Sequence, residues 1–374
     1  MTRVPLSVLD LVPISSGSDA SAALRNSLDL ARRCEELGYA RYWFAEHHLN
    51  PGVAGTSPAV VMALVAGVTS RIRLGSGAVQ LGHRTALATV EEFGLLDAVH
   101  PGRFDMGLGR SGGQRTFARS PTAPRRVAPN GLRIPAPFSF AHLIGSPRLK
   151  LQQTLLQQPQ ALSPDYGEQI DDILALLEGT YIGCDGTDAH AVPGEGADVQ
   201  VWILGSSGGQ SAEVAGRRGL RFAANYHVSP ATVLEAVDAY RAAFEPSATL
   251  ERPYVAVSAD VVVAADRATA EELASGYGPW VRSIRTGEGA IPFPSPGEAR
   301  AQSWTAEDVE LVADRVETQF VGSPADVVAR LEQLQEATDA DELIVTTITH
   351  DAADRVRSYE LLAAAWAASL PASR

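Results

Sequence analysis

The chain is predicted to fold as an α/β protein, a (β/α)8 TIM barrel. Short apolar segments alternate with amphipathic segments over nearly all of its 374 residues. Eight of the apolar segments have the length and composition of buried strands. Polar residues follow these strands, and a closed barrel gathers the carboxyl ends of all its strands at one mouth. An open sheet fits this alternation less well. We therefore expect one domain over residues 1–374.

Start and stop signals define the helices of the first half. The helix expected at 21–37 has Asp19 as its N-cap and Gly38 as its stop. Ser57 followed by Pro58 opens the next helix, at 59–69. The other elements of this half are strands at 4–11, 40–45, 72–81 and 103–109 and a helix at 86–99.

The second half repeats the alternation after a long interruption. Residues 111–164 are rich in Pro, Ser, Arg and Gln and show little periodicity before 149–158, so we expect an inserted active-site lid after the fourth strand. A second inserted loop, at 287–304, follows the seventh strand. The expected strands are 199–204, 220–224, 254–264 and 342–348, and the expected helices are 166–177, 210–218, 230–244, 268–284, 305–316, 324–336 and 352–368.

Composition excludes several classes of partner. The net charge of −13 argues against binding to nucleic acid. The chain has neither a run of about 18 apolar residues nor a secretory signal, which predicts a cytoplasmic protein without a membrane partner. Two cysteines give neither a disulfide framework nor a thiolate metal site, and we predict no metal. Residues 106–164 lack acidic side chains but carry eight basic ones, which indicates either an anionic ligand or a solvated loop.

The most informative stretch is the end of the second strand, Glu46-His47-His48. Two histidines at the carboxyl end of a buried strand lie where α/β proteins hold their ligands. His47 is suited to donate or accept a proton near neutral pH. The alternative is a surface histidine beside a satisfied core histidine. Other polar residues beyond the strands are expected at the same mouth: Asp10, Gln80, His83, Arg110, Ser206, Ser207, Asn225, His227 and His350.

Glycine-rich loops supply two candidate phosphate contacts. Residues 107–112 match G-x-G-x-x-G, but no helix begins there, so what remains is Arg110 on a glycine-rich loop at a strand end, a geometry suited to binding a phosphate. The loop at 204–211 joins a strand to a helix, whose N-terminus favours anions; an ordinary N-cap is the alternative. The small residues at 75–78 indicate either a flat ligand against the strand or a tight barrel bend.

With these motifs the chain resembles the luciferase-like flavin-dependent monooxygenase family, over most of residues 3–110 and 165–370. It is most similar to a subgroup that includes tailoring enzymes of aromatic polyketide pathways, such as that of mensacarcin. The resemblance implies that His47 is the catalytic histidine and that Gly77-Ala78 forms a non-prolyl cis peptide against the flavin ring. It also implies that the cofactor is bound by Gly77, Ala78, Gln80, Arg110, Ser206, Ser207, Gly208 and Ser211, with Trp43, His48 and His227 in the substrate pocket.

The resemblance further implies an enzyme that uses reduced FMN from a separate reductase, together with O2, to hydroxylate or epoxidise an organic substrate. Ser207, Gly208 and Gly109 differ from the residues of bacterial luciferase, which makes light emission an unexpected activity and leaves the flavin open. An F420-dependent oxidoreductase on the same barrel is the first alternative, and a non-catalytic flavin-binding protein is the second. Family members commonly pair through the helices near the second and third strands, so a homodimer is expected.

Overall fold

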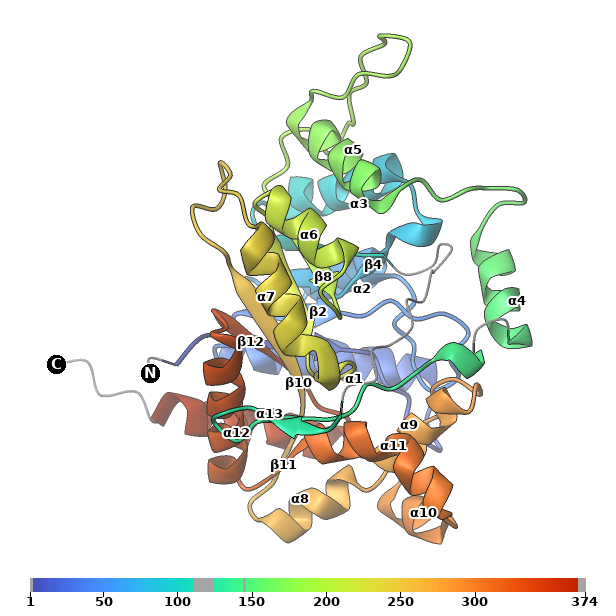
Figure 1. Cartoon of the computed structure of the whole chain (residues 1–374), viewed down its shortest axis with the longest axis vertical. Helices are drawn as coiled ribbons and strands as arrows, with labels where there is room; N and C mark the ends of the chain where they lie inside the picture. Colours follow the sequence, from blue (N-terminus) through green and yellow to red (C-terminus); the bar gives the residue numbers. More distant parts are fainter. Residues whose placement is uncertain (1–2, 111–123, 144–145, 369–374) are drawn as a thin grey trace, which may run out of the picture.

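The computed structural model describes residues 3–110, 124–143 and 146–368. Its centre is a closed barrel of parallel strands surrounded by helices, as predicted (Figure 1). The strands pair in chain order, and the last barrel strand returns to pair with the first. They are β1 (Leu6–Asp10), β2 (Arg41–Phe44), β3 (Arg73–Ser76), β5 (Phe104–Gly109), β8 (Gln200–Gly205), β9 (Arg221–Asn225), β10 (Val255–Val263) and β12 (Glu342–Thr346).

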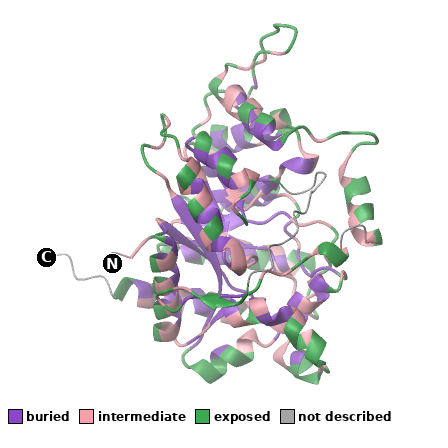
Figure 2. Cartoon of the chain, viewed as in Figure 1, coloured by how far each residue is buried: buried purple, intermediate pink, exposed green. Residues whose placement is uncertain are grey.

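Helices cover the outer face of the barrel and leave the strands buried between them (Figure 2). Asp19 caps the first helix as predicted, since its carboxylate accepts from the Ala22 N–H at 2.7 Å. Ser57 occupies the N-cap of the second helix, but its side chain makes no capping bond within the described residues. The surrounding helices are α1 (Ala20–Glu36), α2 (Pro58–Ala66), α3 (Ala86–Val99), α5 (Tyr166–Glu178), α6 (Gln210–Arg217), α7 (Val233–Ala243), α12 (Pro324–Thr338) and α13 (Ala352–Ala368).

The barrel interior is filled by aromatic and aliphatic side chains. Trp43 and Trp202 are fully buried and meet edge to face, with ring centroids 5.1 Å apart. Glycine at position 75 makes room for them, because a Cβ there would lie 3.0 Å from Cδ2 of Trp43. This packing fills the barrel below the mouth, so a ligand has to bind above it.

A buried ionic cluster closes the opposite end of the barrel. The guanidinium of Arg41 donates to Asp105 at 2.7 Å and to Glu342 at 3.0 Å. Arg73 donates to the other oxygen of Asp105 at 2.9 Å. Burial opposes the charge on Arg41, but the two carboxylates outweigh it and raise the pKa of Arg41. One cation thus links β2, β5 and β12 at the bottom of the barrel.

The first insertion is more regular than predicted. The hairpin of β6 (Arg126–Val127) and β7 (Arg133–Ile134) was missed, because two-residue strands are too short to show an alternating pattern. Leu132 and Ile134 are buried, and Asn130 donates to the carbonyl of Gln333 on α12 at 2.8 Å. After η2 (Ala141–Leu143), helix α4 (Pro147–Leu156) lies close to its predicted position. Residues 111–123 and 144–145 of the insertion lie outside the described part of the chain.

Three other expectations differ from the structure. The single helix predicted at 268–284 is two, α8 (Arg267–Ala274) and α9 (Tyr277–Arg285), separated at Gly276, where a Cβ would lie 2.6 Å from the Pro294 oxygen. The predicted strand 72–81 is interrupted: β3 ends at Ser76, β4 (Val79–Gln80) follows after a break, and a short 3-10 helix, η1 (Leu81–His83), comes next. The second insertion contains α10 (Pro296–Ala301), and a short strand, β11 (Phe320–Gly322), follows α11 (Ala306–Thr318) and pairs with β10.

Within the described residues, no helix has the length and apolar character needed to cross a membrane.

Replacing Arg41 with Ala should lower the free energy of unfolding by about 3–5 kcal/mol, because two buried carboxylates lose their shared cation. Chemical denaturation with tryptophan fluorescence would measure the change. The control is Arg32→Ala, which removes an exposed ion pair with Asp29 and should cost less than about 1 kcal/mol. Equal effects of the two substitutions would contradict the role assigned to the cluster.

Candidate active site

Glu46 is the centre of the polar network at the barrel mouth. Its carboxylate is buried and lies 2.9 Å from Nε2 of His48 and 3.0 Å from Nε2 of His83. Burial raises its pKa, but hydrogen bonds from the two histidines and the charge of Arg84 lower the value to about 2. Because an ionised carboxylate only accepts, both imidazoles carry a proton on Nε2. Glu46 therefore fixes the loops that follow β2 and β3 relative to each other.

The same three residues bring possible metal ligands together. One ligand atom each from Glu46, His48 and His83 lies within 4.8 Å of the others. Arg84, however, places Nε 3.4 Å from the oxygen of Glu46 that both histidines share. Its positive charge opposes a cation at this point, and we interpret the group as a hydrogen-bonded cluster.

His47 differs from its neighbour in that its Nδ1 is buried and has no hydrogen-bond partner among the described residues. Its backbone N–H donates to the Gly55 carbonyl at 2.8 Å, which holds the loop. Burial, and then the charge of His48, lower the pKa of His47 to about 4. The imidazole is therefore neutral at pH 7, with one ring nitrogen free for another group.

His227 lies at the same mouth, beyond β9. Its Nδ1 is 2.6 Å from the hydroxyl of Ser258 on β10. Burial, and then the charges of Arg315 and His47, lower its pKa to about 3. The electrostatic coupling of His47 and His227 shows that the fold brings these two predicted residues together.

The peptide bond between Gly77 and Ala78 is cis, as the resemblance implies. Gln80 follows on β4, where its backbone N–H donates to the Glu46 carboxylate at 3.0 Å and its side chain to the Glu46 carbonyl. A Cβ at Gly77 would meet Leu9 at 2.8 Å and Trp43 at 3.4 Å. Trp43 thus supports this turn from below, buried in the barrel interior, rather than facing the mouth directly.

The predicted phosphate contacts lie together at the ends of β5 and β8. Arg110 is exposed and donates to Gln210 at 3.1 Å, and Gln210 in turn donates to Asp165 at 2.9 Å. Ser206 and Ser207 are exposed, while Gly208 and Ser211 are half-buried. Helix α6 begins here with no side-chain cap in the described structure. Its N-terminus and a guanidinium therefore point to one anion.

One residue expected at the mouth, Asp10, is used elsewhere. Asp10 is buried on the outer face of β1, where Tyr42 donates to it at 2.6 Å and Arg355 at 2.7 Å. Side chains alternate along a strand, so its neighbours Leu9 and Leu11 point inward in its place. His350, by contrast, joins the loops that follow β12 and β1, because its Nε2 bonds to the carbonyl of Ser16 at 3.1 Å.

Sequence reasoning also missed a buried group at the mouth, formed by Asp260, Tyr277 and Arg315. Tyr277 donates to Asp260, and Arg315 donates to the phenol oxygen at 2.7 Å. Burial raises the pKa of Asp260. No local motif marks these residues, because Tyr277 of α9 and Arg315 of α11 come from helices on either side of the second insertion and meet Asp260 of β10 only in the folded chain.

Both insertions run along the rim of the mouth. Arg148 donates to Leu49 and Asn50 beyond β2, and Gln157 donates to Gly82 beyond β3 at 2.8 Å. From the second insertion, the Ala290 carbonyl accepts from Gly52 at 2.7 Å. The described part of 124–164 thus contacts the loops that carry His47 and His83.

The luciferase-like monooxygenase family model matches residues 4–128 and 166–341. The chain belongs to this family. The match confirms the resemblance that the sequence predicted. A luciferase-like monooxygenase of Escherichia coli K12 is 32% identical over 358 residues, which cover 96% of each chain.

Solved structures with the same fold are also found. The crystal structure of apo-MsnO8 has a TM-score of 0.77 and 28% identity, and covers 99% of both chains. The oxygenating constituent of 3,6-diketocamphane monooxygenase from Pseudomonas putida, in complex with FMN, has a TM-score of 0.66, 17% identity and 99% coverage of both chains. An F420-dependent secondary alcohol dehydrogenase has a TM-score of 0.61 and 13% identity, and covers 98% of this chain and 99% of the other. At these identities the last two show the fold alone.

We predict that His47 and His227 stay neutral down to about pH 4 and pH 3, while exposed His190, whose pKa Glu195 raises, gains its proton at higher pH. Histidine-selective NMR, assigned with His→Gln variants, would measure the three titrations. The two depressed values also mean that the unfolded chain binds more protons, so the free energy of unfolding falls as the pH drops from about 6.5 towards 4. Titration of His47 near pH 6.5 would contradict its burial.

Proposed function

We propose that this protein is a two-component flavin monooxygenase that binds reduced FMN and uses O2 to hydroxylate or epoxidise an organic substrate. The observation that carries the proposal is the meeting of a neutral, half-buried His47, a cis Gly77-Ala78 peptide and an anion-binding loop at one mouth. Family membership supports the oxidative chemistry. The resemblance suggests an aromatic polyketide as the substrate class.

The residues at the mouth fit a flavin with a phosphate tail. Arg110, Ser206, Ser207, Gly208 and Ser211 would hold the phosphate at the N-terminus of α6. The ring would lie over Gly77 and Ala78, near Gln80, with Trp43 supporting the strand from below. Bound reduced flavin supplies two electrons, with which one oxygen atom of O2 enters the substrate and the other leaves as water.

His47 would be the group that holds or moves a proton beside the ring. Protonation of its free Nδ1 is unfavourable at neutral pH, because burial favours the neutral form of the imidazole. Such an imidazole can donate a hydrogen bond without adding charge to the pocket. His48 and His227 would border the substrate, each oriented by a fixed partner, Glu46 or Ser258.

The insertion 111–164 would act as a lid. The contacts that Arg148 and Gln157, in its described part, make with the loops beyond β2 and β3 support this role, because these loops border the mouth. A closed lid keeps water from the oxygen chemistry. If iodide in solution efficiently quenched the fluorescence of bound FMN, the flavin would be open to solvent, and this result would contradict the proposed lid.

A separate reductase would supply the reduced flavin. The FMN-bound neighbour is the oxygenating constituent of its monooxygenase, which supports a second, reducing constituent for this protein too. F420 is the alternative cofactor, favoured by the likeness to the F420-dependent dehydrogenase.

The first experiment compares binding of FMN, riboflavin and F420 under anaerobic conditions. The variant Arg110→Gln should weaken FMN binding about tenfold and leave riboflavin, which lacks the phosphate, unchanged. Arg217→Gln, at the C-terminal end of α6 and paired with Glu213, is the control and should change the affinity for neither ligand. If the protein preferred F420 and showed no oxygen-dependent step after reduction, the monooxygenase proposal would be wrong and a hydride-transfer enzyme would take its place.

A homodimer is the second part of the proposal. Helices α2 and α3, with the turn that follows α2, expose a set of apolar side chains: Val60, Leu64, Val68, Leu87, Leu95 and Val99. Exposed apolar stripes of this kind are typical of protein interfaces. These are the helices that follow the second and third barrel strands.

The double variant Leu64→Glu/Leu95→Glu should therefore convert a dimer into a monomer, because it places two charges per chain in an apolar interface. Analytical ultracentrifugation measures the mass. Leu162→Glu, an exposed leucine in the first insertion, is the matched control and should leave the mass unchanged. A monomeric parent protein would overturn this part of the proposal.

A further inference from the structure

Beside the mouth, the hairpin of the first insertion and several elements of the second half of the chain enclose a second concave site. This groove, of about 850 Å³, lies between the β6–β7 hairpin, α8, α9, α11, β11 and α12 (Figure 1). Its size is within the range of small-molecule sites. Tyr226 and Tyr277 separate it from the mouth, since both line the groove while His227 and Asp260 lie on the other side.

The floor of the groove is apolar and aromatic. Trp304 packs against Gly278, where a Cβ would lie 3.2 Å from the indole, and Phe320 lies beneath Arg330. Val309 and Val316 line the groove and are about half exposed, at 55% and 44%. Exposed apolar surface of this kind favours a ligand with an apolar body.

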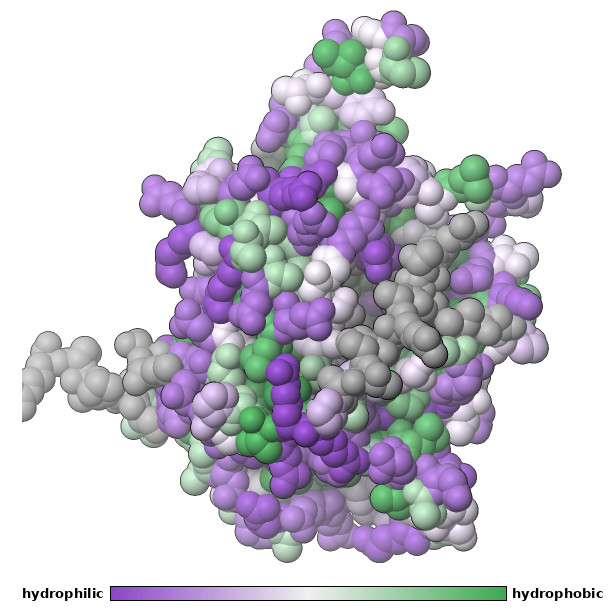
Figure 3. Space-filling view, viewed as in Figure 1, coloured by the Kyte–Doolittle hydropathy of each residue, from purple (hydrophilic) through white to green (hydrophobic). Residues whose placement is uncertain are grey.

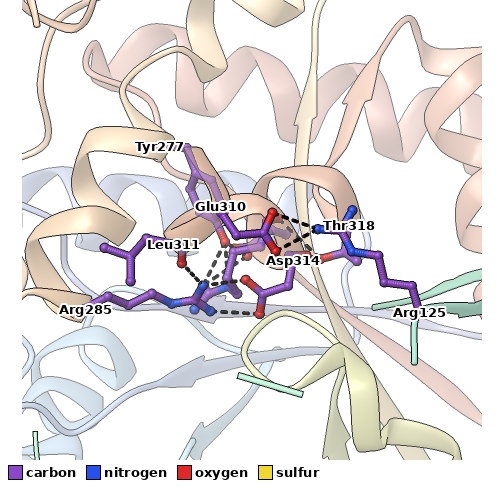
Figure 4. A network of polar contacts seen from close by, with 9 residues as sticks. Arg125, Tyr277, Arg285, Glu310, Leu311, Asp314 and Thr318 are labelled. Carbon is purple, nitrogen blue, oxygen red and sulfur yellow. Dashed lines mark hydrogen bonds and ion pairs between the residues drawn. The ribbon is translucent and has the colours of Figure 1, made fainter. Parts of the chain in front are cut away.

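The walls are held rigidly in place. Arg285 of α9 donates to Asp314 and to the Leu311 carbonyl of α11, and Arg315 donates to Tyr277 (Figure 4). On the opposite side, Tyr226 donates to the Arg133 carbonyl at 2.7 Å and thereby anchors the hairpin. The groove is therefore formed before any ligand arrives.

Three arginines, Arg133, Arg267 and Arg330, line the groove. The guanidinium of Arg330 donates to the carbonyls of Glu317 and Gln319, and no carboxylate pairs with it in the described part of the chain. Burial and the charges of Arg133 and Arg267 lower its pKa. Figure 3 shows strongly hydrophilic side chains beside apolar ones on the face that carries the hairpin.

Acidic residues do not cancel this charge. Glu271 and Glu317 also line the groove, but Arg125 lies 3.3 Å from Glu317. Asp326, outside the lining, pairs with exposed Arg267 at 3.4 Å. The three lining arginines outnumber the two lining glutamates by one, and Arg330 has no carboxylate partner among the described residues, so the groove combines an aromatic floor with a small excess of positive charge.

We propose that this groove is a second ligand site, for an organic anion with an aromatic body and a carboxylate, sulfonate or phosphate group. The aromatic body would lie on Trp304 and the valines, and the anionic group would bind between Arg133, Arg267 and Arg330. The site is separate from the flavin mouth and does not depend on the proposed monooxygenase activity.

Isothermal titration with 2-naphthoate and its neutral counterpart 2-naphthamide tests the proposal on the full chain, with and without saturating FMN. We expect naphthoate to bind more tightly, with FMN leaving its affinity unchanged. The variant Arg133→Gln/Arg267→Gln, which alters two exposed side chains, should weaken naphthoate about tenfold and leave naphthamide within about twofold. Arg300→Gln, an exposed arginine paired with Glu272 outside the groove, is the control and should change neither affinity.

A second variant tests the floor. Trp304→Ala should weaken both ligands to a similar extent, with circular dichroism confirming that the fold is kept. Equal affinity for naphthoate and naphthamide, displacement of naphthoate by FMN, or unchanged binding in the double arginine variant would each overturn the proposal, as would the absence of any binding at millimolar naphthoate.

Discussion

The closure of the barrel depends on the buried cluster around Arg41. Eight strands must return to the first, and the closing pair joins β12 to β1. Arg41 contacts Glu342 of β12 and Asp105 of β5, while Ser7 of β1 donates to the same glutamate. A cluster of charges has a more specific geometry than aliphatic packing, since each partner must be present to offset the cost of burial. The bottom of the barrel thus fixes the relative positions of strands whose upper ends carry the candidate site.

From this base, the interior changes character layer by layer toward the mouth. Above the charges lie the two indoles, and above these come the small residues of the cis turn and the hydroxyl of Ser258. The dry aromatic layer separates the ionic cluster from the histidines. It also explains their low pKa values, because a charge on His47 or His227 has few polar groups to solvate it.

Much of this arrangement could be predicted from the sequence, because it depends on local signals. The alternation of strands and helices gave the barrel, and the polar residues after each strand gave His47, His227 and Arg110 as neighbours of one mouth. Strand periodicity would have placed Asp10 correctly, since its neighbours Leu9 and Leu11 occupy the inner face. The cis peptide followed from the family resemblance alone, as no local pattern of small residues distinguishes it from a bulge.

What could not be predicted depends on contacts between distant segments. Glu46 stands in the most informative stretch, yet its role as acceptor depends on His83 and Arg84, which only the folded chain brings to it. The hairpin forms because Leu132 and Ile134 find an apolar surface and Asn130 finds α12, some two hundred positions later. The groove has the same origin: the first insertion supplies Arg133, while α8, α11 and α12 supply the remaining walls. Insertions that vary in sequence without disturbing the barrel are therefore the parts of this fold that can acquire a new ligand site, since the ionic cluster and the aromatic layer keep the scaffold fixed beneath them.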